Sequence, residues 1–213
     1  MLKILLFISI ISSTLFSGEN RVQTQILKGQ ETTRYISDLA TLRISYFREY
    51  PYFYQVNPSA EKEYLETYSI SPNTLFVVAG EESIGILTGC PLTESAEHYQ
   101  RPFIDNNRDL DKVFCLGEFV FQNGYENEII QKKMYKQLEE QIQKEQIYNQ
   151  ILVYELVQLE NEFAPPGYVS IEEFWNKMGF IKQDDLTFSI PWEDSRTNRV
   201  VDHSLVAWLK NIE

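Results

Sequence analysis

An apolar run that leads through a short polar turn into a long amphipathic helix places the strongest constraint on the fold. The run Val113–Phe121 is typical of a buried strand, and Gln122-Asn123-Gly124 ends it. Apolar residues then recur at every fourth position of the segment 128–146: Ile130, Met134, Leu138 and Ile142. A helix with one such face needs a surface to pack against, so the sequence predicts strands covered by helices.

Further strands and helices follow from the same patterns. Strands are predicted at residues 22–27, 74–79, 84–87, 113–121, 151–157, 186–190 and 204–209. Helices are predicted at residues 39–50, 60–68, 128–146 and 171–178, and the first is expected to have Asp38 as its N-cap. Residues 91–111 are predicted to form a loop. The order of these elements predicts an α/β fold of one domain, with a mixed sheet and helices on its faces.

The amino-terminal residues differ in character from the rest. Met1-Leu2-Lys3 is basic, residues 4–16 are almost wholly apolar, and Ser17-Gly18 are small, which is the layout of a secretory signal peptide. The apolar run is shorter than the ~20 residues of a transmembrane helix. We therefore expect a leader at residues 1–18 and a single domain at 19–213, although a first strand or buried helix is the alternative for the leader. The protein would be secreted or periplasmic if the leader is cleaved, and cytoplasmic otherwise.

The charge balance limits the classes of partner. The chain has 213 residues, with 31 acidic against 19 basic side chains and a formal net charge of -12. An acidic surface without a Lys/Arg run repels phosphate backbones, so the sequence predicts no nucleic-acid partner. His98 and His203 are isolated and lack the spacing of metal ligands, so no metal site is predicted.

The two cysteines allow two interpretations. Cys90 and Cys115 both lie in strand-like runs that could be neighbours in an antiparallel sheet. In a cytosolic protein they would be core thiols, whereas in an exported protein they could form a disulfide.

Three blocks of sequence carry a resemblance to a known family. They are residues 46–52 (Tyr-Phe-Arg-Glu-Tyr-Pro-Tyr), 113–118 (Val-Phe-Cys-Leu-Gly-Glu) and 173–180 (Glu-Phe-Trp-Asn-Lys-Met-Gly-Phe). Their order and spacing resemble a bacterial subfamily of the GNAT family of N-acetyltransferases, over nearly all of residues 19–213. The resemblance implies a mostly antiparallel twisted sheet flanked by helices on both faces. It also implies acetyl-CoA as the cofactor and an amine of a small molecule or a protein as the acceptor.

The loop that should hold the cofactor departs from the family pattern. In GNAT enzymes a loop of the form Arg/Gln-x-x-Gly-x-Gly/Ala holds the pyrophosphate on backbone N–H groups at a helix amino end. With the register set by Gly117-Glu118, the residues implied to line the cofactor are Phe119, Phe121, Glu126, Asn127, Glu128, Ile129, Ile130 and Gln131. The usual Arg or Gln is here Glu126, and the two small positions are Ile129 and Gln131. The sequence therefore predicts a loop that has lost its phosphate contacts.

The resemblance also implies sites for catalysis and acceptor binding. Glu118 matches the strand glutamate that many GNAT enzymes use as general base, and the alternative is a half-exposed glutamate paired with a neighbour. The tyrosine that often acts as general acid corresponds to Trp175, whose indole cannot donate a proton in this role. The acceptor pocket would involve three tyrosines that could equally form a packed aromatic cluster: Tyr50, Tyr52 and Tyr54.

Two functions follow as expectations. One is a GNAT-fold binding protein with impaired or lost acetyl-CoA-dependent transfer, which holds a ligand or partner in the former substrate cleft. The substituted loop, Trp175 and the leader favour it. The other is an active acetyl-CoA-dependent N-acetyltransferase on a small-molecule or protein amine, with Glu118 as general base.

Overall fold

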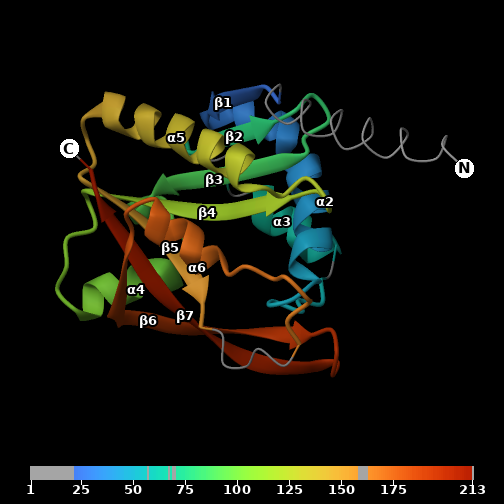
Figure 1. The fold of residues 1–213 in the computed structure, drawn as a ribbon. Helices are drawn as coiled ribbons and strands as arrows, with labels where there is room; N and C mark the ends of the chain where they lie inside the picture. Colours follow the sequence, from blue (N-terminus) through green and yellow to red (C-terminus); the bar gives the residue numbers. More distant parts are fainter. Residues whose placement is uncertain (1–21, 57, 67, 69–70, 158–162, 213) are drawn as a thin grey trace, which may run out of the picture.

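The computed structural model describes residues 22–56, 58–66, 68, 71–157 and 163–212, which form one seven-stranded sheet with helices on both faces (Figure 1). The strand order is β1-β2-β3-β4-β5-β7-β6. Neighbouring strands are antiparallel except β4 and β5, which are parallel. The expected mixed, mostly antiparallel sheet is confirmed.

The elements have the following bounds. The strands are β1 Thr24–Lys28, β2 Leu75–Ala79, β3 Gly85–Pro91, β4 Val113–Phe121, β5 Gln150–Leu156, β6 Ile181–Asp194 and β7 Arg199–Asn211. The α-helices are α2 Ile36–Phe47, α3 Pro58–Glu66, α4 Glu97–Asp105, α5 Glu128–Glu145 and α6 Ile171–Lys177. Two 3₁₀ turns are η1 Gly29–Tyr35 and η3 Leu92–Glu94. The predicted leader, residues 1–18, lies outside the described residues, and none of the described helices is long and apolar enough to cross a membrane.

The sheet separates two layers of core because alternate strand residues point to opposite sides. On one face the apolar stripe of α5 packs on the sheet together with α6, so that Met134, Val77 and Trp175 share one buried cluster. On the other face Phe76 of β2 packs with Leu39 of α2 in a second cluster. A third cluster joins α4 to β5 and the β6–β7 hairpin. The four-residue repeat that predicted the long helix thus marks the face that α5 buries.

Strands β4 and β5 lie side by side only at their beginnings. The parallel register joins Val113–Cys115 to Gln150–Leu152, and the later residues of each strand have no partner in the other. β5 instead pairs along its full length with β7. The two strands therefore diverge, and a gap opens in the middle of the sheet.

The predicted secondary structure was wrong in two regions of the chain. Residues 91–111, expected to be a loop, contain η3 and the helix α4. Helix α4 is short and has Pro102 inside it, so its periodic signal is too weak to recognise. The last two strands are far longer than residues 186–190 and 204–209. Pro191 inside β6 and the charged residues toward the ends of both strands weakened the strand signal there, although the apolar alternation of β6 continues to Trp192.

Smaller differences concern Asp38 and the cysteines. Helix α2 begins at Ile36 because η1 leads directly into it, and the carboxylate of Asp38 accepts a hydrogen bond from Ser83 Oγ at 2.6 Å instead of capping the helix. Cys90 and Cys115 stand opposite each other in β3 and β4, and both are free thiols. Burial and the nearby carboxylate of Glu118 raise the pKa of Cys90 to about 12.

Candidate ligand-binding cleft

The gap between the diverging strands opens into a cavity of about 430 Å³. Its walls include Gly117–Phe119 of β4, Val153–Leu156 of β5, Arg43 and Tyr46 of α2, and Trp175 of α6. Most of the lining is aromatic or aliphatic, with a few carboxylates among it. Cavities of about 300–1,000 Å³ with this composition commonly hold small molecules.

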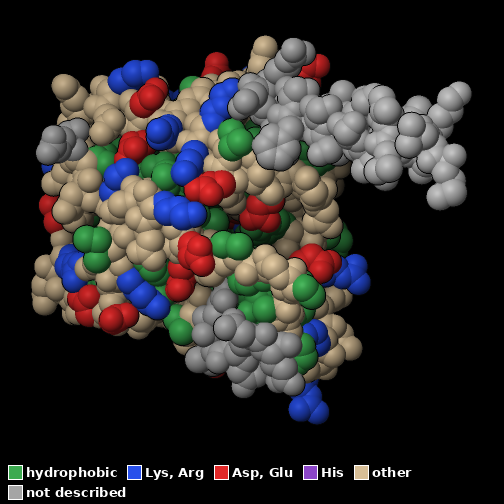
Figure 2. All heavy atoms as spheres, in the orientation of Figure 1, with side chains coloured by type: hydrophobic (Ala, Val, Ile, Leu, Met, Phe, Trp, Pro, Cys, Tyr) green, Lys and Arg blue, Asp and Glu red, His purple; other side chains and the backbone are tan. Residues whose placement is uncertain are grey.

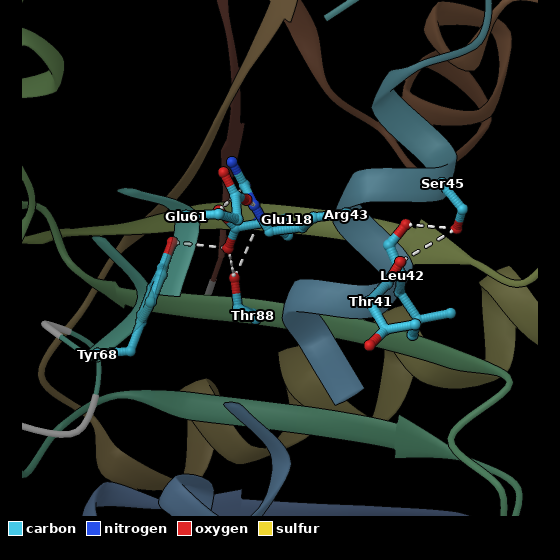
Figure 3. A network of polar contacts seen from close by, with 8 residues as sticks. All are labelled: Thr41, Leu42, Arg43, Ser45, Glu61, Tyr68, Thr88 and Glu118. Atoms are coloured by element: carbon cyan, nitrogen blue, oxygen red, sulfur yellow. Dashed lines mark hydrogen bonds and ion pairs between the residues drawn. The ribbon is translucent and has the colours of Figure 1, made fainter. Parts of the chain in front are cut away.

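Glu118 lies in a closed network of polar side chains at one wall of this cavity (Figure 3). One carboxylate oxygen accepts from the guanidinium of Arg43, which also contacts Glu61. The other oxygen accepts from the hydroxyls of Tyr68 at 2.7 Å and Thr88 at 2.6 Å. Glu118 is only 4% exposed. Glu118 is therefore paired with neighbouring groups through both of its carboxylate oxygens. The alternative suggested by the sequence, a paired but half-exposed glutamate, was wrong about the exposure.

The local sequence explains how this network forms. Leu39 and Leu42 of α2 are buried in the core. Arg43 follows Leu42 at the edge of this buried face of the helix, where its guanidinium reaches Glu118 of β4. Gly117 leaves the space that the hydroxyls need, because a Cβ atom there would lie 2.6 Å from both Thr88 Oγ1 and Tyr68 Oη. Burial works against the charge of Arg43, but Glu118 and the neighbouring groups raise its pKa, so the guanidinium remains a cation.

A second carboxylate, that of Glu155 on β5, lines the same cavity with one oxygen engaged. The indole Nε1 of Trp175 donates to Glu155 Oε1 at 2.6 Å, and this is the only hydrogen bond of that carboxylate among the described residues. Burial raises the pKa of Glu155 to about 7, and the hydrogen bond from Trp175 lowers it only in part. Glu155 thus has the ionisation expected of a group that gains or loses a proton near neutral pH.

The amino end of α5 is occupied by protein groups. The side-chain oxygen of Asn127 accepts from the backbone N–H of Ile129 at 3.1 Å and of Ile130 at 3.0 Å. Asn is a favoured N-cap, and these N–H groups are among those that a helix otherwise leaves free for an anion. A phosphate could reach both of them only by displacing Asn127.

Carboxylates surround this helix end. Glu126 Oε1 accepts from the hydroxyl of Tyr46 at 2.9 Å and from Nε2 of Gln131 at 3.2 Å. Glu126, Glu128 and Gln131 line a second cavity of about 680 Å³. Figure 2 shows acidic side chains beside a hollow near the middle of this face. The place implied for a pyrophosphate is therefore rich in negative charge.

The lysines near this end are engaged with protein groups. Lys132 and Lys177 contact Glu128 at 2.6 Å and 3.4 Å. Lys133 Nζ donates to the backbone oxygen of Val22 at 2.6 Å. Lys132 and Lys177 therefore offset the charge of Glu128, and Lys133 holds the segment before β1. Little of their positive charge is left for a phosphate.

The three tyrosines predicted to bind an acceptor do not share one cavity. Tyr52 lines both cavities, and its ring centroid lies 4.7 Å from that of Phe47. Tyr54 lines the 430 Å³ cavity only, whereas Tyr50 lines the 680 Å³ cavity and lies 4.8 Å from the ring of Tyr168. Of these three tyrosines, Tyr52 is the one that lines both cavities, as Tyr46 and Ile171 also do.

The residues predicted to line a cofactor are likewise divided. Phe119 lines the 430 Å³ cavity, and Phe121 lines the 680 Å³ cavity. Four others also line the larger cavity: Glu126, Asn127, Glu128 and Gln131. Ile130 is buried in the core beneath α5 and Ile129 is 48% exposed, and neither is in the lining of these two cavities.

The histidines lie apart from each other. His98 is in the lining of the 430 Å³ cavity, and His203 stacks on Trp192 with ring centroids 3.6 Å apart. Within the described part of the chain, no three His, Cys, Asp or Glu side chains are grouped so that they could hold a metal ion.

Several solved structures with a similar arrangement of elements are acetyltransferases. NAA60 of Arabidopsis thaliana in complex with acetyl-CoA has a TM-score of 0.58 at 9% identity, over 89% of this chain and 99% of that one. The chain has the GNAT fold. A GNAT-family acetyltransferase of Staphylococcus aureus gives 0.54 at 17% identity, over 90% and 100% of the two chains. Aminoglycoside 6'-acetyltransferase type Ii gives 0.52 at 14% identity, over 89% and 97%.

The sequence itself has no comparable match. No protein-family model matches it, and no curated protein matches it significantly. The GNAT fold is therefore shown by the arrangement of the elements, while the chemistry of the site has to be argued from its own residues.

Sequence reasoning missed three members of the GNAT-fold cleft: Arg43, Glu61 and Glu155. Glu155 did carry a signal, since it is a charged residue inside the apolar run Ile151–Val157, as Glu118 is inside Val113–Phe121. Arg43 and Glu61 carried none, because charged residues on helices are usually solvated.

Proposed function

We propose that this protein is a GNAT-fold binding protein that holds a small ligand in the 430 Å³ cavity, with acetyl-CoA-dependent transfer impaired or lost. The observation that carries the proposal is the occupied amino end of α5. Asn127 accepts from the backbone N–H groups of Ile129 and Ile130, which in an anion site would bind a phosphate.

Electrostatics supports the same conclusion. The carboxylate of Glu126 is held by Tyr46 and Gln131 beside that helix end. A carboxylate about 4 Å from a phosphate charge is repelled by roughly 1 kcal/mol in water and by about 4 kcal/mol at an effective dielectric of 20. Because Glu126 is exposed, the smaller value is the more appropriate one, and it adds to the cost of displacing Asn127.

The position of Trp175 argues against the usual acid catalyst. The ring is fully buried among Phe119, Phe174 and Phe180, and its N–H is engaged by Glu155. An indole N–H donates a hydrogen bond but does not give up its proton near neutral pH. Trp175 therefore positions Glu155 and fills space, and a leaving thiolate would find no proton there.

The alternative is an active acetyl-CoA-dependent N-acetyltransferase with Glu118 as general base, acting on a small-molecule or protein amine. The cavity at the gap between β4 and β5, with Glu118 in its wall, favours this function. However, both carboxylate oxygens of Glu118 are already engaged, by Arg43 and by the hydroxyls of Tyr68 and Thr88, so an amine would have to displace one of these partners to reach Glu118.

Export would support the loss of transfer. Acetyl-CoA is an intracellular metabolite, so a chain whose residues 1–18 are removed during secretion would meet little of it. Mass spectrometry of the mature amino terminus tests this part of the proposal, and a terminus at Met1 would contradict it.

The deciding experiment is a thermal-shift titration of the full chain with acetyl-CoA. A ligand present at 100 times its Kd stabilises a protein by about 2.7 kcal/mol, which is readily detected. We expect no shift at millimolar acetyl-CoA. A clear shift at micromolar acetyl-CoA would support the acetyltransferase instead.

A gain-of-binding variant sharpens the test. Asn127→Gly, Glu126→Arg, Ile129→Gly and Gln131→Gly together free the helix amino end and reverse the charge at position 126 beside it. We expect this combination to acquire a thermal shift with acetyl-CoA. The control is Glu140→Arg, which makes the same charge reversal on an exposed position of α5 away from that end and should acquire none.

A further inference from the structure

The 430 Å³ cavity has an excess of negative charge. Its lining contains the carboxylates of Glu61, Glu118 and Glu155 and one guanidinium, that of Arg43. Arg43 is bound to Glu61 and Glu118 together, so these three groups already carry one net negative charge. Ionised Glu155 would add a second, with no cation in the described lining to balance it.

Glu155 is the carboxylate that has room for a ligand. Its Oε1 accepts from Trp175, and its other oxygen has no hydrogen-bond partner among the described residues. Aromatic rings from three parts of the fold line the cavity around it, including those of Tyr46, Tyr52 and Phe119. Aromatic faces attract a desolvated cation, and a carboxylate complements its charge.

We propose that this cavity binds an organic cation, whose positive charge lies against the free oxygen of Glu155 and the surrounding rings, and that binding expels the proton of Glu155 to solvent. The inference rests on the proposed function, since it takes this cavity as the ligand site. In chemical terms the protonated carboxyl group and the cation become a carboxylate–cation pair, and one proton passes to the buffer.

Among the titratable groups of this cavity, Glu155 is the one whose protonation changes when a cation binds. Glu172 of α6 adds a nearby negative charge, which disfavours the ionised carboxylate in the empty site. Burial raises the pKa of Tyr46 and of Tyr52 well above their ordinary value, so both hydroxyls stay neutral. Burial also lowers the pKa of His98 at the cavity wall. Across the cavity, the ion pair of Arg43 with Glu118 and Glu61 is closed on itself.

The test compares choline with 3,3-dimethyl-1-butanol, its neutral carbon isostere, by titration calorimetry on the full chain. Choline is a cation at every pH, so any proton released comes from the protein. We expect choline to bind at least about tenfold more tightly than the isostere, since the carboxylate and the aromatic faces attract the charge that only choline carries. The Kd of choline should rise about tenfold per pH unit below 7 and level off above 8.

Proton release gives a readout that needs no variant. At pH 6, titrations in two buffers of different ionisation enthalpy should show about one proton released per choline bound. Equal binding of choline and its isostere, a Kd that does not change with pH, or no binding of choline at millimolar concentration would each overturn the inference.

Variants assign the effect to Glu155. Glu155→Gln should weaken choline binding more than about tenfold at pH 8 and abolish the pH dependence. Trp175→Phe removes the donor that favours the carboxylate, so the midpoint of the pH dependence should move upward. Glu128→Gln removes one charge outside this cavity and should leave both properties unchanged. A Glu155→Gln protein that binds like the wild type would also overturn the inference.

The two proposals fail in different ways. Binding of acetyl-CoA would contradict the proposed function whatever choline does. Failure of the choline test with no acetyl-CoA binding would remove only the ligand class, because the loss of transfer is argued from α5 and not from Glu155.

Discussion

Replacing Arg43 by methionine should destabilise the protein severely, because it leaves two buried carboxylates without their shared cation. The side chains of Arg43 and Glu118 are 12% and 4% exposed, and Glu61 is buried as well. Removing one partner of such a pair typically costs about 3–5 kcal/mol. In a protein of this size that corresponds to a fall in Tm of about 6–20 °C, at ~2–4 °C per kcal/mol.

Urea denaturation of the wild type, Arg43→Met, Glu118→Gln and the double variant measures this effect. The double variant should lose less than the sum of the single losses, with a coupling of about 0.5–3 kcal/mol, since a neutral glutamine side chain in β4 no longer needs a counter-charge. Arg101→Met is the control, because its ion pair with Asp105 is exposed and should be worth about 1 kcal/mol or less. A loss below about 1 kcal/mol for Arg43→Met would refute the view that Glu118 is held as a buried ion pair.

Three further changes test the local account. Asn127→Ala should cost about 1 kcal/mol of unfolding free energy in urea, whereas Asn127→Asp, which keeps the capping oxygen, should cost little. Gly117→Ala should destabilise by about 1–3 kcal/mol, because its Cβ would meet the hydroxyls of Thr88 and Tyr68, and a near-neutral result would contradict the close packing. The raised pKa of Glu155 should make the wild type lose stability as pH rises from 4.5 to about 7, since the unfolded chain releases that proton first. At 1.36 kcal/mol per pKa unit the loss is about 3 kcal/mol, and Glu155→Gln, measured in urea at both ends of this range, should lack it.

The fold could be predicted from patterns that are local in sequence. The four-residue repeat of α5 and the apolar run of β4 are properties of one segment each, and both elements occur where they were expected. Helix α4 and the outer β6–β7 hairpin escaped prediction because their residues are held by contacts with distant segments. Tyr54, for example, bridges to Asp194, and Trp192 Nε1 donates to the backbone oxygen of Tyr52.

The candidate site could be predicted only in part for the same reason. The departure of residues 126–131 from the loop pattern that the resemblance implies was visible in sequence, because that pattern is continuous along the chain. The predicted helix did begin at Glu128, so the Asn127 cap could have been recognised from the sequence. The contact between Arg43 and Glu118 could not, because it requires α2 to cross β4. The raised pKa of Glu155 and its place in the cavity depend on the divergence of β4 and β5, on the hydrogen bond from Trp175 and on burial. These features come from separate segments, so none of those segments predicts them alone.

The central claim, that the amino end of α5 no longer serves a pyrophosphate, is tested most directly by equilibrium dialysis of the full chain against radiolabelled acetyl-CoA. The structure predicts no retention of label above a bovine serum albumin control at concentrations up to the millimolar range. Saturable retention with a micromolar Kd, abolished by unlabelled CoA, would contradict it.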